Sequence, residues 1–128
     1  MKVAFTSKTG EMIDQHFGMA ENFTIWEMGP DDAYPLETIQ VEKREGDEED
    51  KIAARVALLK DCAIVYTMQI GGPAAAKLIA QRIHPMKTGS EVSLKETVER
   101  LQEVLRGNPP PWLRKAMNKE QATSFIED

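Results

Sequence analysis

The sequence is poor in the side chains that most often hold metals, because its 128 residues include only one cysteine, Cys62, and two histidines, His16 and His84. A cysteine count of one excludes an internal disulfide framework. It also excludes a four-cysteine iron–sulfur cluster or a structural zinc knuckle held by one chain. Such sparing use of cysteine fits a reducing compartment, so we expect a cytoplasmic protein.

Long apolar runs and an excess of positive charge are also missing. No stretch of 18 apolar residues occurs, so the sequence predicts no membrane span. Residues Met1–Thr6 have the pattern of an ordinary first strand and not of a signal peptide. The net charge is −5, from 16 basic and 21 acidic residues. Because nucleic-acid binding draws its affinity from a basic face, this balance predicts that no nucleic acid is bound.

The length and composition indicate one globular α/β domain. Apolar residues make up 41% and charged residues 29% of the chain, which is typical of a globular protein. The first half contains three β-rich segments, and their short links favour antiparallel neighbours with the third strand at an edge. These predicted strands are Lys2–Thr6, Asn22–Met28 and Leu36–Val41.

The second half alternates helices with strands. Ser93-x-x-Glu96 is a capping box, which predicts the start of the last long helix. The acidic run Glu45–Asp50 could be a partner patch, but carboxylates at a helix N-terminus are the stronger interpretation. In chain order, the predicted elements are a helix over Glu48–Leu59, a strand over Ala63–Met68, a helix over Ala74–Arg82, a strand over Ile83–Lys87 and a helix from Leu94 that ends at Gly107.

This order, β-β-β-α-β-α-β-α, predicts one mixed five-stranded sheet with helices on both faces. We place this α/β domain at residues 1–107. Pro109-Pro110-Pro111 prevents continuation of the last helix. Residues 108–128 are expected to form a C-terminal extension, with a short amphipathic turn from Trp112 and a partly flexible end.

The connection between the first two predicted strands, Ser7–Glu21, is longer than a hairpin needs, and such loops are usually functional or disordered. Its composition is not that of a disordered segment, and its glycines, Gly10 and Gly18, can take positive φ. We predict that Phe17 anchors the loop in the core and that its neighbour His16 points to solvent. A neutral imidazole there is a good ligand for a soft or borderline metal. Composition alone favours a surface or hydrogen-bonded histidine without a ligand.

Three other features are weaker candidates. Cys62 lies between a helix end and a buried strand, where a packing role is the stronger interpretation and a second-ligand role stays open. His84 is interpreted as a packed or surface histidine. Gly71-Gly72 at a helix start could bind an anion through backbone N–H groups, but a helix start also needs glycine merely to turn. No metalloprotease or nucleotide-binding motif accompanies them.

Three blocks of the sequence resemble a known family in their order and spacing. They are Asp14-Gln15-His16-Phe17-Gly18 with Phe23-Thr24-Ile25-Trp26, then Asp61-Cys62-Ala63-Ile64-Val65-Tyr66 with Ile70-Gly71-Gly72-Pro73-Ala74-Ala75-Ala76, and Ile83-His84-Pro85-Met86-Lys87. They resemble the nitrogenase iron–molybdenum cofactor-binding family, which includes NifX, NafY and the C-terminal domain of NifB. The resemblance covers nearly the whole chain. Its ending, 101–113, is similar to the NifX-like members.

This resemblance implies a ribonuclease-H-like α/β fold without hydrolysis, since Lys2–Thr6 lacks the first-strand carboxylate of the ribonucleases. It implies transient binding and transfer of an iron–sulfur precursor of the iron–molybdenum cofactor. The implied partners are nitrogenase cofactor-assembly proteins, with a NifB-type donor and a scaffold-type recipient. The family's cluster-binding histidine maps onto His16. Lys8 stands in Ser7-Lys8-Thr9-Gly10, where many members have an aspartate before the glycine, and its charge would favour an anionic cluster.

Three functions can be compared on this basis. The first is a cluster carrier that is not an enzyme, with His16 as metal ligand and Lys8 and Cys62 as further cofactor-binding candidates. A preassembled cluster has its own sulfides, so one or two protein ligands suffice and permit release. The second is an interaction or regulatory protein that binds nitrogenase components without a cluster. The third is a small hydrolase or phosphate-binding enzyme at Gly71-Gly72, which lacks a nucleophile and paired carboxylates.

Overall fold

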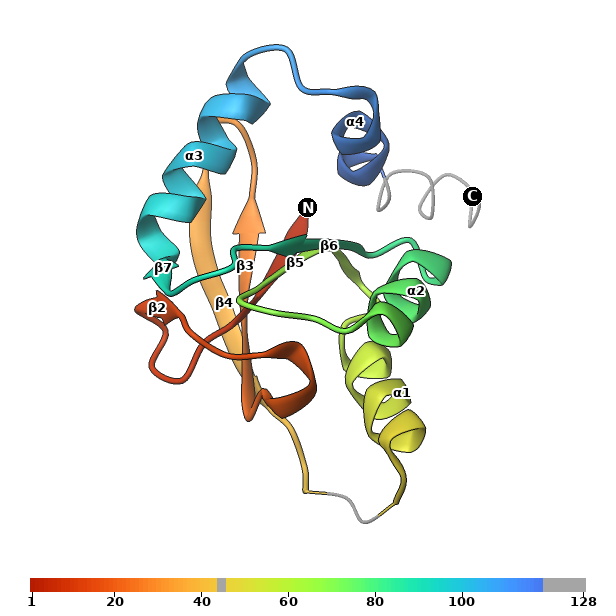
Figure 1. Cartoon of the computed structure of the whole chain (residues 1–128). Helices are drawn as coiled ribbons and strands as arrows, with labels where there is room; N and C mark the ends of the chain where they lie inside the picture. Colours follow the sequence, from red (N-terminus) through yellow and green to blue (C-terminus); the bar gives the residue numbers. More distant parts are fainter. Residues whose placement is uncertain (44–45, 119–128) are drawn as a thin grey trace.

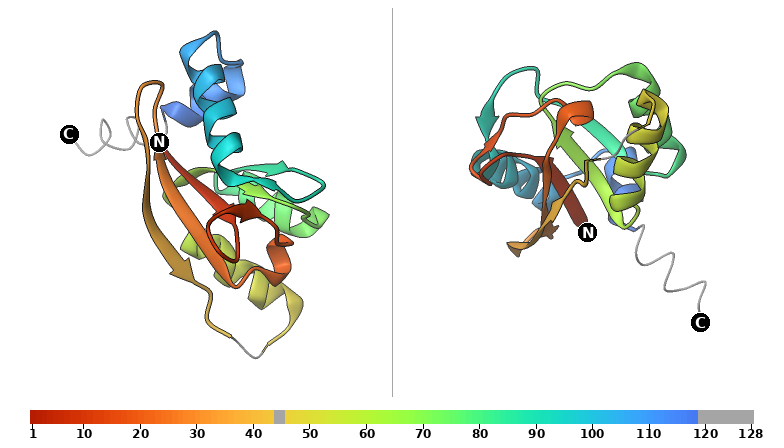
Figure 2. Two further views of the ribbon diagram at one scale, coloured as in Figure 1. Left: turned by 90° about the vertical axis from the view of Figure 1, so that its left-hand side faces the viewer. Right: turned by 90° about the horizontal axis from the view of Figure 1, so that it is seen from below.

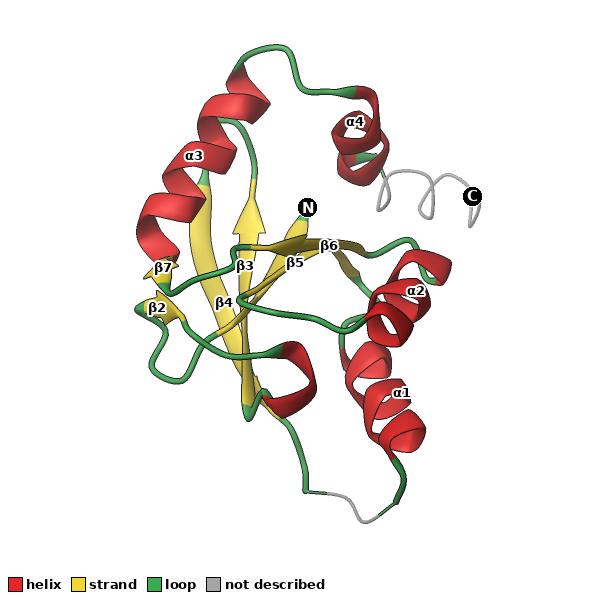
Figure 3. Cartoon of the chain, in the orientation of Figure 1, coloured by secondary structure: helices red, strands yellow, loops and turns green. Residues whose placement is uncertain are grey.

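The computed structural model describes residues 1–43 and 46–118, and its centre is a mixed five-stranded β-sheet with helices against both faces (Figure 1). The strands of this sheet are β1 (Lys2–Thr6), β3 (Asn22–Met28), β4 (Ala33–Gln40), β5 (Cys62–Thr67) and β6 (His84–Lys87). The helices are α1 (Glu48–Leu58), α2 (Gly72–Ala80), α3 (Leu94–Arg106), α4 (Pro111–Met117) and a one-turn 3-10 helix, η1 (Phe17–Met19). Two further strands, β2 (Met12–Ile13) and β7 (Val92–Ser93), pair with each other beside the main sheet (Figure 3).

The strands lie in the order β4-β3-β1-β5-β6. β1, β3 and β4 form antiparallel pairs, in which Val3 lies opposite Trp26. This confirms the pairing predicted from their links, and β4 is at an edge as predicted. β5 pairs parallel with β1, and β6 pairs parallel with β5, because α1 and α2 carry the chain back between successive strands.

Alternation along the strands divides the apolar side chains between two cores. On one face, Ala4 and Val65 pack in a core with the apolar side chains of α1 and α2. On the other face, Phe5 and Ile64 pack with those of α3 and α4. Figure 2 shows α1 and α2 on one side of the sheet and α3 on the other. The predicted mixed sheet with helices on both faces is therefore observed, whereas the ribonuclease-H-like assignment stays a prediction.

Side-chain caps start two of the α-helices. The Ser93 hydroxyl accepts a hydrogen bond from the Glu96 N–H at 3.2 Å, which confirms the predicted cap of α3. Asp47 accepts from the Asp50 N–H at 2.8 Å at the start of α1. The first turn of α1 holds three carboxylates, Glu48, Glu49 and Asp50, in accord with the macrodipole interpretation.

The boundaries of several elements differ from those predicted. β4 begins at Ala33, three residues before Leu36, because an edge strand can include a proline such as Pro35. α2 ends at Ala80, and Arg82 adopts a left-handed conformation with φ 61°. The predicted order contained none of η1, β2 and β7, since elements of two or three residues are too short to show periodicity.

Residues 108–118 pack against the sheet, in the core that α3 also lines. Leu113 of α4 is only 1% exposed in this core. Trp112 stacks on His84 of β6, so the start of α4 lies against the edge of the sheet. The division at residue 107 stays a prediction, and the expected flexible end, residues 119–128, lies outside the described residues. Within residues 1–43 and 46–118, no helix is long and apolar enough to cross a membrane.

Candidate functional site

The loop between β1 and β3, residues 7–21, lies at the carboxyl ends of the parallel strands β1 and β5 (Figure 1). Along the strand order, the chain passes from β1 to β3 in one direction and from β5 to β6 in the opposite direction. In open α/β sheets, ligands bind outside the carboxyl ends of the strands, where the connections diverge in this way. The loop is therefore the first candidate for a binding site.

A small network of buried hydroxyl groups holds this loop on the sheet. Thr6 ends β1 and Thr67 ends β5, and both side chains are fully buried. The Oγ1 atoms of Thr6 and Thr67 lie 2.8 and 3.0 Å from the carbonyl oxygen of Gln15. The Gln15 side chain in turn accepts a hydrogen bond from the Glu21 N–H at 3.3 Å. These hydrogen bonds offset the cost of burying the polar groups. They also fix the position of Gln15, the residue before His16.

Backbone hydrogen bonds continue this attachment on both sides of His16. The Phe17 N–H donates to the Gln69 carbonyl at 2.8 Å, and the Met68 N–H donates to the Gln15 carbonyl at 3.1 Å. His16 therefore forms an isolated parallel bridge with Gln69, in the segment that follows β5. The loop extends the sheet past the end of β5 instead of standing free above it.

Phe17 anchors the loop, as predicted. Its side chain is completely buried in the core beneath α1 and α2, and its ring lies 5.7 Å from that of Phe23, centroid to centroid. The His16 side chain is exposed. The predicted opposition between a buried phenylalanine and a solvent-facing imidazole is therefore confirmed.

The His16 ring also caps η1. Its Nδ1 atom accepts a hydrogen bond from the Gly18 N–H at 3.2 Å. A neutral ring that accepts at Nδ1 carries its proton on Nε2. Either nitrogen can ligate a metal only through a lone pair, so ligation by Nε2 moves the proton to Nδ1, and ligation by Nδ1 uses its lone pair. Metal binding at His16 therefore competes with the Gly18 hydrogen bond.

Lys8 lies on the first part of the same loop, where its side chain is exposed. The Lys8 backbone N–H donates to the carboxylate of Asp14 at 3.1 Å. The buried Ser7 hydroxyl accepts from the Gly10 N–H at 2.9 Å, and Gly10 adopts φ 88°, which favours glycine. The loop thus turns back on itself between Ser7 and Asp14, with the Lys8 amine in solvent.

The structure does not bring Cys62 to His16. Cys62 starts β5 and is buried in the core beneath α1 and α2. The His16 loop meets the other end of this strand, at Thr67, five residues and about 16 Å farther along an extended chain. A cysteine–histidine ligand pair is therefore not assembled in this structure.

His84 also lies away from the loop, at the start of β6 opposite Ile64. Its ring stacks on the indole of Trp112, with centroids 4.0 Å apart and planes 16° apart. Burial lowers the pKa of His84 from its ordinary value of 6.5. These contacts are those of a packed histidine, as interpreted from the sequence.

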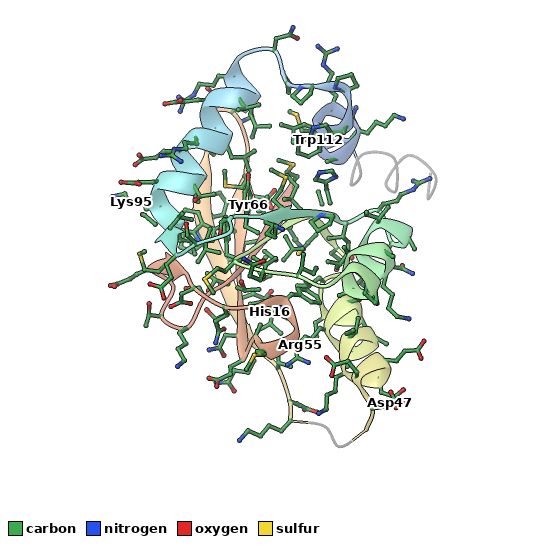
Figure 4. The ribbon with its side chains drawn as sticks, in the orientation of Figure 1. His16, Asp47, Arg55, Tyr66, Lys95 and Trp112 are labelled. Atoms are coloured by element: carbon green, nitrogen blue, oxygen red, sulfur yellow. The ribbon has the colours of Figure 1, made fainter. Side chains whose placement is uncertain are left out.

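A groove of about 660 Å³ opens beside η1, between that turn, the end of β4 and α1. Arg55 reaches from α1 to η1 and donates a hydrogen bond to the Ala20 carbonyl at 3.2 Å (Figure 4). Burial lowers the pKa of Arg55, and the nearby charge of Glu48 opposes this effect. Lys43 and Lys51 also line the groove. The exposed turn is thus braced from α1 as well as from the sheet.

Several of these positioning residues were not among the predicted candidates. Thr6 and Thr67 could have been noticed as polar residues that end apolar strands, but their meeting at Gln15 depends on the pairing of β1 with β5. Nothing local to Arg55 predicts its contact with η1. In residues 1–43 and 46–118, no group of three or more His, Cys, Asp or Glu side chains is arranged to hold a metal ion.

Comparison with known proteins relates the chain to nitrogenase proteins. The model of the dinitrogenase iron-molybdenum cofactor family matches residues 1–104. Protein NifX of Herbaspirillum seropedicae is 42% identical, over all of this chain and 90% of its own length. Protein NifY of Azotobacter vinelandii is 39% identical over 94% of this chain, which spans only 49% of NifY. The crystal structure of PH0822 has the same fold, with a TM-score of 0.67 at 20% identity over 80% of this chain and 89% of PH0822.

The match to the family model spans all strands of the sheet, the helices α1 and α2, most of α3 and the loop that carries His16. The alignment with NifX covers the whole chain, α4 included. The chain is therefore a NifX-like member of the dinitrogenase iron-molybdenum cofactor family.

Proposed function

We propose that the chain carries an iron–sulfur precursor of the iron–molybdenum cofactor during its biosynthesis, with His16 as a ligand of the cluster. The family and its NifX and NifY members support a part in nitrogenase cofactor biosynthesis. One observation carries the narrower proposal. The His16 imidazole is exposed on a loop whose anchors, Phe17, Thr6 and Thr67, are fully buried, so the ligand is presented to solvent from a fixed position.

The chemistry of a single exposed imidazole suits a carrier. A preassembled cluster already has its bridging sulfides, so the protein needs to supply only one or two ligands. The competing Gly18 hydrogen bond has a net worth of roughly 1 kcal/mol and re-forms when the cluster leaves. Cargo held by so few bonds can be passed on, whereas a cage of four thiolates would retain it.

The other candidate residues have lesser parts in this proposal. Lys8, exposed on the same loop, adds positive charge for an anionic cluster. Cys62 packs in the core at the other end of β5. The donor is a NifB-type protein and the recipient a scaffold-type protein of the assembly pathway. No catalytic step is required, and β1 carries no carboxylate.

Anaerobic reconstitution with iron and sulfide tests this proposal. We expect the parent protein to turn brown and to retain iron through gel filtration, and His16→Ala to retain much less. His84→Gln is the matched control, because it removes the other histidine and leaves the loop intact. Equal iron in the parent and in His16→Ala would contradict the assignment. A parent that retains no iron would favour the alternative, an adaptor that binds nitrogenase components without a cluster.

A further inference from the structure

The one-turn helix η1 sorts its side chains into two pairs. The Met19 N–H donates to the His16 carbonyl at 3.0 Å, and the Ala20 N–H donates to the Phe17 carbonyl at 3.3 Å. These are the bonds of a 3-10 helix, in which side chains three positions apart stand on the same face. Phe17 and Ala20 share the buried face, with no exposed surface. His16, the extended N-cap residue, and Met19, the last residue of the turn, are both exposed to solvent.

The exposure of Met19 is not explained by packing. Its side chain is 75% exposed, more than any other large apolar side chain in the described part of the protein. The other methionines there are buried or half-buried. Methionine is usually an interior residue because its thioether is apolar and polarizable. The backbone hydrogen bond from the Met19 N–H to the His16 carbonyl therefore joins an exposed thioether and an exposed imidazole in one anchored turn.

The two side chains form a suitable pair of ligands for iron. A thioether is a soft ligand and an imidazole a borderline one, and a methionine–histidine pair is an established axial set for haem iron. Both ligands are neutral, so they add no negative charge to an anionic cluster. A thioether bond is also weaker than a thiolate bond, which suits cargo that must be released.

We propose that the Met19 sulfur is a second ligand, which acts together with His16 on one iron–sulfur cluster. This inference rests on the proposed carrier function and adds a residue to its site. It explains how a chain with its single cysteine buried in the core, at the other end of β5, presents a sulfur ligand beside His16. The groove that Met19 also lines leaves space on the α1 side of the turn.

Release of iron to a chelator tests the pair. Met19→Leu preserves side-chain volume and removes the sulfur, and Met117→Leu on α4 is the matched control. After anaerobic reconstitution, we expect Met19→Leu to lose its cluster to an iron chelator at least several-fold faster than the parent. We expect Met117→Leu to match the parent. Thermal unfolding of the unloaded variants establishes that both are folded.

A second measurement reports on the sulfur directly. In protein labelled with carbon-13 at the methionine methyl groups, the Met19 signal is identified by its absence from Met19→Leu. Loading should shift or broaden that signal more than the other methionine signals. Equal release rates together with an unmoved Met19 signal, while His16→Ala still loses its iron, would overturn the pair and leave the carrier function in place. A parent that binds no iron at all would overturn both.

Discussion

The hydroxyl oxygens of Thr6 and Thr67 lie 3.2 Å apart at the ends of two adjacent parallel strands, and both face the carbonyl oxygen of Gln15. This contact joins the first strand, the β5 strand and the segment that carries His16. The position of the imidazole therefore depends on the register of β1 against β5, in which Phe5 lies beside Tyr66.

Removal of one hydroxyl should loosen the loop. Thr67→Val removes one donor to the buried Gln15 carbonyl, which keeps the Thr6 hydroxyl and the Met68 N–H. We therefore expect a loss of about 0.5–1.5 kcal/mol in the free energy of unfolding. Iron retention should fall as well, because the segment that carries His16 is held by fewer hydrogen bonds. Thr24→Val on β3 is the control, because Thr24 is also buried and lies outside the network. Urea denaturation measures the stability, and equal losses for both variants would contradict this role of Thr67.

Truncation of the two neighbours His16 and Phe17 should lower the stability by very different amounts. Phe17→Ala removes a fully buried ring from the core beneath α1 and α2, which typically costs about 3–5 kcal/mol. His16→Ala removes an exposed side chain together with its hydrogen bond from the Gly18 N–H, for which about 0.5–1.5 kcal/mol is expected. Thermal unfolding of the unloaded proteins distinguishes the two. A Phe17→Ala variant as stable as the parent would mean that the loop has another anchor.

Gly10 and Gly18 both lie in this loop, but only Gly10 has a positive φ, of 88°. Gly10→Ala should therefore cost about 1–2 kcal/mol, the usual penalty for a left-handed residue with a side chain. A Cβ at Gly18 would lie 3.8 Å from the His16 Nδ1 and 3.9 Å from a Glu48 carboxylate oxygen, which is ordinary contact. We expect Gly18→Ala to fold normally. Urea denaturation of the two variants should rank them in this order.

The sequence predicted the parts of the site that depend on local pattern. Adjacent Phe17 and His16 were assigned opposite environments because an anchored loop must turn neighbouring side chains apart. The positions of the three antiparallel strands followed from their β-rich segments and links. The cap at Ser93 followed from the spacing to Glu96.

The remainder of the site depends on contacts between distant segments. The Thr6–Thr67 contact joins residues 61 positions apart, and Arg55 meets Ala20 across 35 positions. No window of sequence contains either pair. The 3-10 turn at η1 is equally hidden, because three residues are too few to show a period, and so the exposure of both His16 and Met19 at the ends of one turn emerged only from the structure.

The stability of the protein should depend on pH through His84. Burial lowers its pKa from 6.5. Above pH 6.5 the ring is neutral in the folded and the unfolded chain. As the pH falls below 6.5, the unfolded chain takes up the proton first, so stability is lost until the pH passes the lowered pKa of the folded state. We expect a weaker loss in His84→Phe, which preserves the ring stacked on Trp112. Urea denaturation at several pH values on both sides of 6.5 measures the free energy of unfolding of each protein. An equal fall of this free energy with pH in the parent and in His84→Phe would contradict the assignment.

Variants of Cys62 test whether the affinity of a thiolate for iron or the position of the side chain decides which residues bind the cluster. A thiolate is the ligand that iron–sulfur clusters most often use, so chemistry alone would select Cys62. Its position argues against this role, because the side chain is 3% exposed and lies at the opposite end of β5 from the loop that presents His16. A thiol in such surroundings is inert and acts as a small apolar side chain.

We therefore expect Cys62→Ser to retain most of the iron that the parent retains. It should lose about 1–3 kcal/mol in the free energy of unfolding, because a hydroxyl replaces a thiol in an apolar core. Cys62→Ala is the companion variant, since it removes the sulfur without introducing a polar group. Iron per chain after anaerobic loading decides the question for both. If both variants lost as much iron as His16→Ala, β5 would have to present the thiolate to the cluster, and the ligand set would be a cysteine and a histidine drawn from opposite ends of that strand.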